Sequence, residues 1–187
     1  MQRAQRALEL EVRICSAGCP LPHGSKELFK QLRRTLLAAY RDERLETSVD
    51  EVHRLLKQPV PARIEGARNA YEIFGGQKDF GRMSDKGQFR RSDGALFNFA
   101  LTVADAVSGS GLELLAYDFE LRLPEGRTPA FVRFDFNLPR QANSDNGLRC
   151  HLHPGHDDLQ APSALMAPVE LLELFLYGLR FRERRRT

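Results

Sequence analysis

The feature that most constrains the fold is a strict alternation of apolar and polar side chains at residues 132–138. The apolar positions are Val132, Phe134, Phe136 and Leu138. Polar side chains stand between them at Arg133, Asp135 and Asn137. Side chains two positions apart lie on the same face of a β-strand, whereas a helix has a longer period. The pattern therefore predicts a strand in a sheet with one apolar face and one polar face.

Three further segments of the second half have strand character and follow one another closely. They are residues 96–103, 114–123 and 148–153. Turn-forming sequences at 108–111 and 124–127 connect neighbouring strands, which favours an antiparallel meander. Pro168 then begins an apolar stretch that ends near Tyr177 and is suited to a helix lying on one face of the sheet.

The first half of the chain is predicted to be helical. Ser25 is a candidate N-cap for an amphipathic helix, and Ser48 and Glu51 have the spacing of a capping box before a second helix. Apolar residues recur at helical intervals within 64–74, where a Gly-Gly pair follows. The expected fold class is therefore α+β in a single domain, 1–187. A helical N-terminal half (1–76) and a glycine-rich loop (77–94) precede an antiparallel sheet covered on one face by a C-terminal helix (95–187).

Composition excludes several classes of protein. The chain has 187 residues, of which 42% are apolar and 28% charged, and this suits a globular domain with a real core. No stretch comes near the roughly 18 uncharged apolar residues that a membrane span needs, so we expect no membrane partner. The three cysteines and the charged N-terminal sequence indicate neither a disulfide scaffold nor a secretory signal, and we expect a cytoplasmic protein.

A histidine cluster is the strongest candidate for a functional site. Three of the five histidines, His151, His153 and His156, lie within six residues and precede Asp157 and Asp158. Imidazole can donate or accept a proton at neutral pH, and it is a common metal ligand. The polar face of an antiparallel sheet is often simply solvated, so a solvated surface is the alternative interpretation.

Strand alternation connects this cluster to the strand before it. If the two strands are neighbours, His151 and His153 share the polar face with Arg133 and Asp135. The candidate catalytic residues are His151, His153, His156, Asp135 and Arg133. The sequence identifies no cofactor and leaves metal binding open; in a metal-dependent version, Asp157 or Asp158 would join His151 and His153 as ligands.

Basic side chains gather in two places, although the net charge is only +3. The candidate nucleic-acid-binding residues are Lys78, Arg82, Arg90, Arg91, Arg182, Arg184 and Arg185. Phosphate attraction depends on such local clusters rather than on the total charge. Phe80 and Phe89 lie within the first cluster and are candidates for stacking on bases. A charged loop and a solvated helix end would carry the same residues, so both interpretations stand.

The segment from Arg133 to the histidines resembles the TumE family of bacterial toxins from toxin–antitoxin pairs. The family's element of arginine, aspartate, asparagine and proline corresponds to Arg133, Asp135, Asn137 and Pro139, and grouped histidines follow. In this chain Phe136 separates the aspartate from the asparagine, and residues 140–149 delay the histidines. The resemblance covers about the last third of the chain. It implies a toxin that acts on RNA or another phosphate-bearing target, with an antitoxin as protein partner.

Two interpretations of function remain. In the first, the chain is a ribonuclease-like, phosphodiester-cleaving enzyme. One histidine would deprotonate a ribose hydroxyl and another would protonate the leaving oxygen, while Arg133 stabilises the phosphate and Asp135 orients a histidine. A metal-activated water is the variant of this scheme. In the second, the chain is a non-catalytic module that binds a protein or a nucleic acid. The segment with His151, His153 and His156 is then only an ordered loop.

Overall fold

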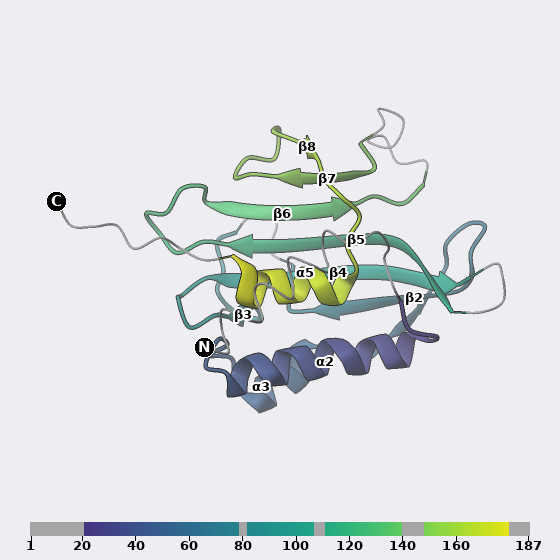
Figure 1. Cartoon of the computed structure of the whole chain (residues 1–187), viewed down its shortest axis with the longest axis horizontal. Helices are drawn as coiled ribbons and strands as arrows, with labels where there is room; N and C mark the ends of the chain where they lie inside the picture. The colour runs from purple at the N-terminus through teal and green to yellow at the C-terminus, as the bar shows by residue number, and fades with distance from the viewer. Residues whose placement is uncertain (1–20, 79–81, 107–110, 140–147, 180–187) are drawn as a thin grey trace.

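An eight-stranded antiparallel sheet is the main element of the structure, a computed structural model that describes residues 21–78, 82–106, 111–139 and 148–179 (Figure 1). The strands are β1 (Val60–Ala62), β2 (Arg68–Gly75), β3 (Phe89–Arg90), β4 (Leu96–Asp105), β5 (Leu112–Arg122), β6 (Phe131–Phe136), β7 (Cys150–His153) and β8 (Ala161–Pro162). Their order across the sheet is β1-β2-β4-β5-β6-β7-β8. Strand β3 pairs with β4 on the side that β2 also occupies. The predicted antiparallel sheet is therefore confirmed, and it extends further than the second half.

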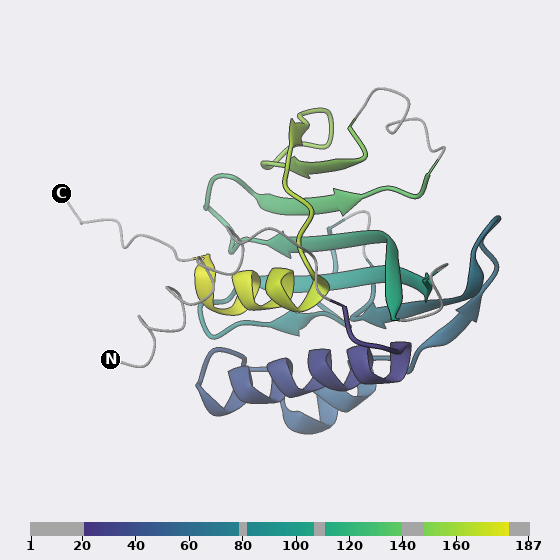
Figure 2. The same ribbon diagram turned by 45° about the vertical axis from the view of Figure 1, so that its right-hand side comes forward.

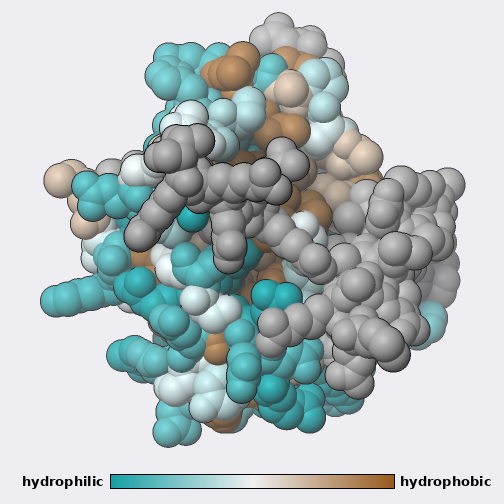
Figure 3. Space-filling model, turned by 60° about the vertical axis from the view of Figure 1, so that its left-hand side comes forward, coloured by the Kyte–Doolittle hydropathy of each residue, from teal (hydrophilic) through white to brown (hydrophobic). Residues whose placement is uncertain are grey.

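The described helices are α2 (Ser25–Arg41), α3 (Val49–Leu55) and α5 (Pro168–Glu173), and a π-helical turn η1 (Leu174–Gly178) continues α5. Helices α2 and α5 lie on the same face of the sheet in both views (Figures 1 and 2). None of the described helices is long and apolar enough to cross a bilayer. At the end of the sheet that carries the β5–β6 turn, the surface is mainly hydrophilic, and apolar residues gather in the upper half of the view (Figure 3).

The core lies between this helical layer and the apolar face of the sheet. The pairing register places Phe99, Phe119, Phe134 and Leu152 side by side across four strands. The rings of Phe99 and Phe119 stack with centroids 4.9 Å apart, and Phe175 of η1 meets Phe119 edge-on at 6.1 Å. Both arrangements are favourable for aromatic quadrupoles, and the side chains are almost fully buried. The alternation read from the sequence thus corresponds to one buried apolar layer.

The predicted fold class is wrong for the first half, because the described part of the chain is mostly antiparallel sheet with three short helices, and the described residues of the first half are not helical throughout. The segment 64–74 was predicted as a helix, but residues from Arg68 to Gly75 form β2, which pairs with β4. Its apolar residues include Ile73, Tyr71 and Phe74, which are β-branched or aromatic and favour strands. Pairing with a distant strand therefore outweighs a local helical spacing. Residues 1–20 of the predicted half lie outside the described residues.

The glycine-rich segment 77–94 also differs from its prediction where the structure describes it. It contains β3, and the Phe89 side chain is fully buried rather than available for stacking on a base. Phe89 stacks instead on Phe97, with ring centroids 5.0 Å apart. Phe80 lies outside the described residues. The segment is therefore partly core, and Arg82 within it donates to Glu120 of β5.

Gly75, which the sequence suggested as a helix stop, occupies a strand position that leaves no room for a side chain. A Cβ at this position would lie 2.2 Å from the nearest carbon of the Phe99 ring. That ring is held by its stacking on Phe119, so it cannot move away cheaply. We expect Gly75→Ala to lower the free energy of unfolding by about 1–3 kcal/mol through overpacking, as measured by chemical denaturation.

The cost should be smaller in a Phe99→Leu background, because the shorter side chain relieves the overlap. Equal costs in both backgrounds would contradict the packing seen at this position, and a double-mutant cycle measures the difference directly.

Candidate functional site

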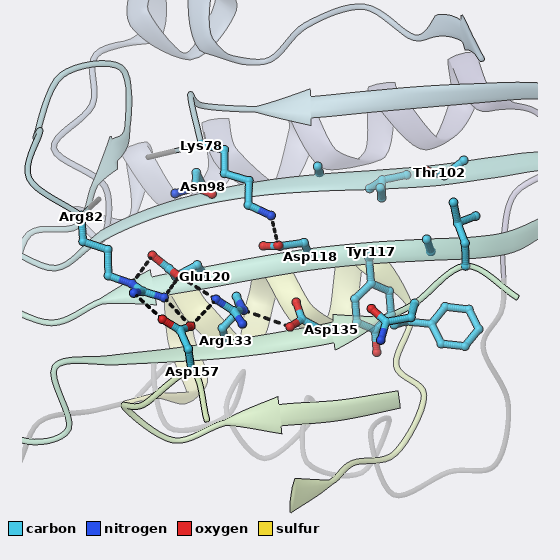
Figure 4. Close-up of a pocket in the computed structure, with 16 residues that line it drawn as sticks. Lys78, Arg82, Asn98, Thr102, Tyr117, Asp118, Glu120, Arg133, Asp135 and Asp157 are labelled. Carbon is cyan, nitrogen blue, oxygen red and sulfur yellow. Dashed lines mark hydrogen bonds and ion pairs between the residues drawn. The ribbon is translucent and has the colours of Figure 1, made fainter. Parts of the chain in front are cut away.

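Two rows of polar side chains cross the sheet on the face away from α2 and α5 (Figure 4). The pairing register gives the first row as Asn98, Glu120, Arg133 and His153. The second row consists of Asp118, Asp135 and His151, and the apolar Ala100 lies at its β4 end. Directly opposed residues in an antiparallel sheet have Cβ atoms about 4.5–5.5 Å apart and share a face. The register therefore brings together side chains from β5, β6 and β7 that are distant in sequence.

Asp135, His151 and His153 form a buried cluster within these rows, and we call it the His–Asp cluster. One ligand-type atom from each residue lies within 4.8 Å of the other two. Nε2 of His153 is 3.2 Å from Oδ2 of Asp135, and Nε2 of His151 is 3.6 Å from the same oxygen. The two histidine side chains are only 1% and 3% exposed. Polar groups removed from water in this way need partners within the protein.

Backbone carbonyls hold both imidazoles from the side away from Asp135. Nδ1 of His151 lies 2.8 Å from the carbonyl oxygen of Leu148, and Nδ1 of His153 lies 3.4 Å from that of His156. A carbonyl oxygen can only accept, so Nδ1 of His151 carries the proton. In the neutral ring, Nε2 then presents an unprotonated lone pair toward the carboxylate. This atom is buried and has no hydrogen-bond partner among the described residues.

Asp135 is oriented from the same strand by Arg133, whose Nε donates to Oδ2 at 2.9 Å. Its second oxygen, Oδ1, is buried and has no hydrogen-bond partner in the described part of the chain. Burial raises the pKa of Asp135 above its usual value, and the charge of Asp118 on the neighbouring strand raises it further, whereas Arg133 opposes the shift. The charged form of this carboxylate is therefore less stable than that of a carboxylate in water.

A pocket of about 490 Å³ lies over the polar rows, and Asp135 and Arg133 line it while neither clustered histidine does. At one end of the pocket, the guanidinium groups of Arg82 and Arg133 both donate hydrogen bonds to the Asp157 carboxylate (Figure 4). Arg82 donates to both oxygens of Asp157 at 3.0 Å, and Arg133 donates from Nη1 to Asp157 at 2.7 Å. We call this arrangement the arginine fork. Arg82 also bonds Glu120, and its guanidinium stacks 3.7 Å above the Phe131 ring.

The turn that presents Asp157 depends on one glycine. Gly155 has a φ of 98°, a conformation that other residues rarely adopt. A Cβ at this position would also lie 2.5 Å from Cβ of Pro129. The Pro154-Gly155 turn, which follows His153, therefore packs against the β5–β6 connection and places Asp157 opposite Arg133.

The charges that line the pocket are nearly balanced. They comprise three cations and four carboxylates, which gives a net charge of −1 with neutral histidines. The cations are Lys78, Arg82 and Arg133, and the carboxylates are Asp118, Glu120, Asp135 and Asp157. Lys78 forms an ion pair with Asp118. The pocket by itself is therefore not the strongly positive surface that the basic residues of the sequence suggested.

The structure places the remaining predicted site residues away from the His–Asp cluster. The His156 ring is exposed, and its Nδ1 accepts from the backbone N–H of Asp158. The Arg91 side chain is buried and donates to the carbonyl oxygens of Phe175 and Leu179, so it holds the end of η1. Arg90 is exposed and lies 3.4 Å from Asp85. Arg182, Arg184 and Arg185 lie outside the described residues.

The sequence-based site omitted Asp118 and Glu120. Both alternate with apolar residues in β5, so the signal that identified Arg133 and Asp135 was present for them as well. The candidate metal ligands also change. Asp157 belongs to the arginine fork and Asp158 is highly exposed, so the carboxylate that approaches the two histidines is Asp135.

Comparison of the chain with protein-family models, with curated proteins and with solved structures found no match. The resemblance to the TumE family therefore stays a prediction, and the function has to be argued from the geometry of the pocket.

The arginine fork gives a pH-dependent prediction. Hydrogen bonding from Arg82 lowers the pKa of Asp157 to about 2, with the charges of Arg82 and Arg133 acting in the same direction. A lowered folded-state pKa contributes stability above the unfolded value near 4 and loses it as the pH falls toward 2. We expect Asp157→Asn to lower the melting temperature at pH 6. The difference from wild type should shrink steadily between pH 4 and pH 2.5 in thermal denaturation. A difference that stays constant over this range would contradict the fork.

Proposed function

We propose that this protein cleaves phosphodiester bonds, with RNA as the substrate class, in the pocket beside the His–Asp cluster. The observation that carries the proposal is the position of Arg133. Its Nε donates to Asp135 of the cluster, and its Nη1 donates to Asp157 in the fork. An anion held where the Asp157 carboxylate now lies would be one side chain away from the cluster. Anion binding and bond cleavage would then share one arginine.

Asp157 stands in this account for the substrate's phosphate. Forked guanidinium groups bind carboxylates and phosphates with the same paired hydrogen bonds. The Asp157 side chain is 51% exposed and belongs to a turn rather than to the sheet. A phosphate can therefore displace it into solvent without leaving a buried charge unpaired. The pocket volume is also within the range that holds small ligands such as one nucleotide.

The burial of the two imidazoles argues for activation of the nucleophile through Asp135. A histidine that exchanges a proton with a ribose hydroxyl has to come within hydrogen-bond distance of it. His151 and His153 do not line the pocket, but Asp135 does. The proposal therefore places the attacking water next to Asp135, while Arg82 and Arg133 stabilise the charge that develops on the phosphate.

RNA is preferred over other phosphodiesters because of the resemblance to the TumE toxins, and the same resemblance supports an antitoxin-like protein as partner. Lys78 and Arg82 lie at the pocket and are the members of the predicted nucleic-acid-binding set that would contact the substrate there. A non-catalytic binding module is the competing function, and it predicts binding without turnover.

The direct test is cleavage of total RNA by the full-length chain. We expect Asp135→Asn to reduce the rate at least about 100-fold, because it removes the charge that links the pocket to both histidines while preserving the side-chain size. His156→Ala is the matched control, since its ring is exposed in the same turn and lies outside the cluster. It should retain wild-type activity. RNA binding without cleavage by the wild-type protein would support the binding module and remove the enzyme proposal.

The role of Asp157 as a stand-in has its own test. We expect Asp157→Asn to bind a short, non-cleavable RNA about threefold to tenfold more tightly, since the competing carboxylate charge is gone. Asp158→Asn changes the net charge equally, but Asp158 is exposed outside the fork, so it should have little effect. Fluorescence anisotropy measures both variants. Equal gains from the two variants would mean a general charge effect, and no gain from either would remove the stand-in.

A further inference from the structure

We propose that Asp135, His151 and His153 bind one divalent transition-metal ion of the zinc type, through Nε2 of each histidine and the carboxylate of Asp135. This site deepens the proposed function and, as an account of catalysis, rests on it. Ion binding itself can be measured without any substrate.

Two hydrogen-bond acceptors face each other inside the cluster. Because Nδ1 of His151 donates to the Leu148 carbonyl, Nε2 of the neutral ring is an acceptor, and it points toward Oδ2 of Asp135, another acceptor. Two buried acceptors face to face repel each other unless a proton or a metal ion lies between them. The distance of 3.6 Å is also longer than a direct hydrogen bond would favour. A metal ion satisfies Nε2 of His151 and the carboxylate at the same time.

The distances between the histidine nitrogens and the Asp135 oxygen match those between ligands of a tetrahedral zinc ion. Zinc binds histidine nitrogen at about 2.0–2.1 Å and carboxylate oxygen at about 2.0–2.2 Å, so two ligand atoms at a tetrahedral angle lie about 3.4 Å apart. The two nitrogen–oxygen distances of 3.2 and 3.6 Å bracket this value. The three ligand atoms all lie within 4.8 Å of one another. The backbone already supplies the arrangement, because His151 pairs directly with Asp135 and His153 follows two residues later on the same face.

The outer contacts are those that ligating groups require. Metal-bound histidines almost always donate their other ring nitrogen to a carbonyl or a carboxylate, and metal-bound carboxylates accept further hydrogen bonds. The Leu148 and His156 carbonyls lie in those positions for the two histidines, and Arg133 does so for Asp135. Two imidazoles favour zinc and similar transition metals over Mg²⁺ and Ca²⁺, which prefer oxygen ligands.

An ion held by these three ligands would keep a coordination position free on the side of the pocket. Three protein ligands leave at least one position for water, which is the arrangement of catalytic rather than structural zinc sites. Asp135 is the ligand that lines the pocket, so this position faces the arginine fork. A divalent ion would also change the net charge of the pocket and cluster from −1 to +1, which favours an anionic substrate.

The step that the ion would support is hydrolysis. A water bound at the open position releases one proton to solvent more readily than free water does. Its oxygen forms a bond to phosphorus, the bond between phosphorus and the leaving oxygen breaks, and the leaving oxygen takes a proton from solvent. Nothing is oxidised or reduced in this step. Arg82 and Arg133 would hold the phosphoryl oxygens during the attack.

The test is a titration of the full-length chain, stripped with a chelator, with Zn²⁺ in competition with a chromophoric chelator. We expect one tight site per chain that excess Mg²⁺ does not occupy. Asp135→Asn and His153→Gln should each weaken binding at least about 100-fold, because loss of a ligand costs more than the roughly 10–100-fold that loss of an outer partner costs. His53→Gln and Asp158→Asn are the controls and should bind as the wild type does, because both side chains are exposed outside the cluster. Circular dichroism and melting temperature establish that each variant folds.

A second measurement does not depend on any variant. Co²⁺ added to the stripped wild-type chain should give the visible absorption bands of a site with few ligands, and Zn²⁺ should abolish them. Absence of a tight site, or tight binding that survives both Asp135→Asn and His153→Gln, would overturn the inference. Zn²⁺ binding without RNA cleavage would support the metal site and remove the proposed function. RNA cleavage that persists in the presence of chelators would support the proposed function and remove the metal site.

Discussion

The pairing register of β4, β5, β6 and β7 decides both what is buried beneath the helices and what meets in the pocket. The register that aligns Phe99, Phe119 and Phe134 on one face aligns Asp118, Asp135 and His151 on the other. A slip of one residue in β6 would turn Asp135 into the core and expose Phe134 to the pocket. Aromatic burial therefore fixes the site, because the free energy that holds the core in register also holds the cluster together.

The same register creates an electrostatic problem that the protein solves only in part. Glu120 is satisfied by Arg82, and Arg133 bridges Asp135 and Asp157. The interior of the cluster is different, because the Nε2 lone pair of His151 meets an incompletely neutralised carboxylate away from water. Such an arrangement is costly in an empty site and favourable around a cation. The two groups thus suit ions of opposite charge. The arginine fork binds an anion, the Asp157 carboxylate, whereas the cluster is suited to a cation.

Local periodicity predicted the site better than it predicted the fold. Period-two alternation at 132–138 identified the shared face of Arg133, Asp135, His151 and His153, because a half-buried strand leaves a direct record in its sequence. The same method failed at 64–74, where helical spacing was coincidental and pairing with β4 decided the structure. The clustering of basic residues gave no indication that Phe89 and Arg91 are buried, because their burial depends on partners that are distant in sequence. The bridging of Asp157 between two arginines could not be predicted, since Arg82 reaches it across 75 positions.

The central claim is that Asp135, His151 and His153 are the ligands of one metal ion, and anomalous diffraction at the zinc absorption edge tests it most directly. Crystals of the full-length protein grown with Zn²⁺ should give one strong anomalous peak at about 2.0–2.2 Å from Nε2 of both histidines and from the Asp135 carboxylate. The fourth ligand should face the pocket. A cluster without a peak at saturating Zn²⁺, or with Nε2 of His151 directly hydrogen-bonded to Asp135, would contradict the account.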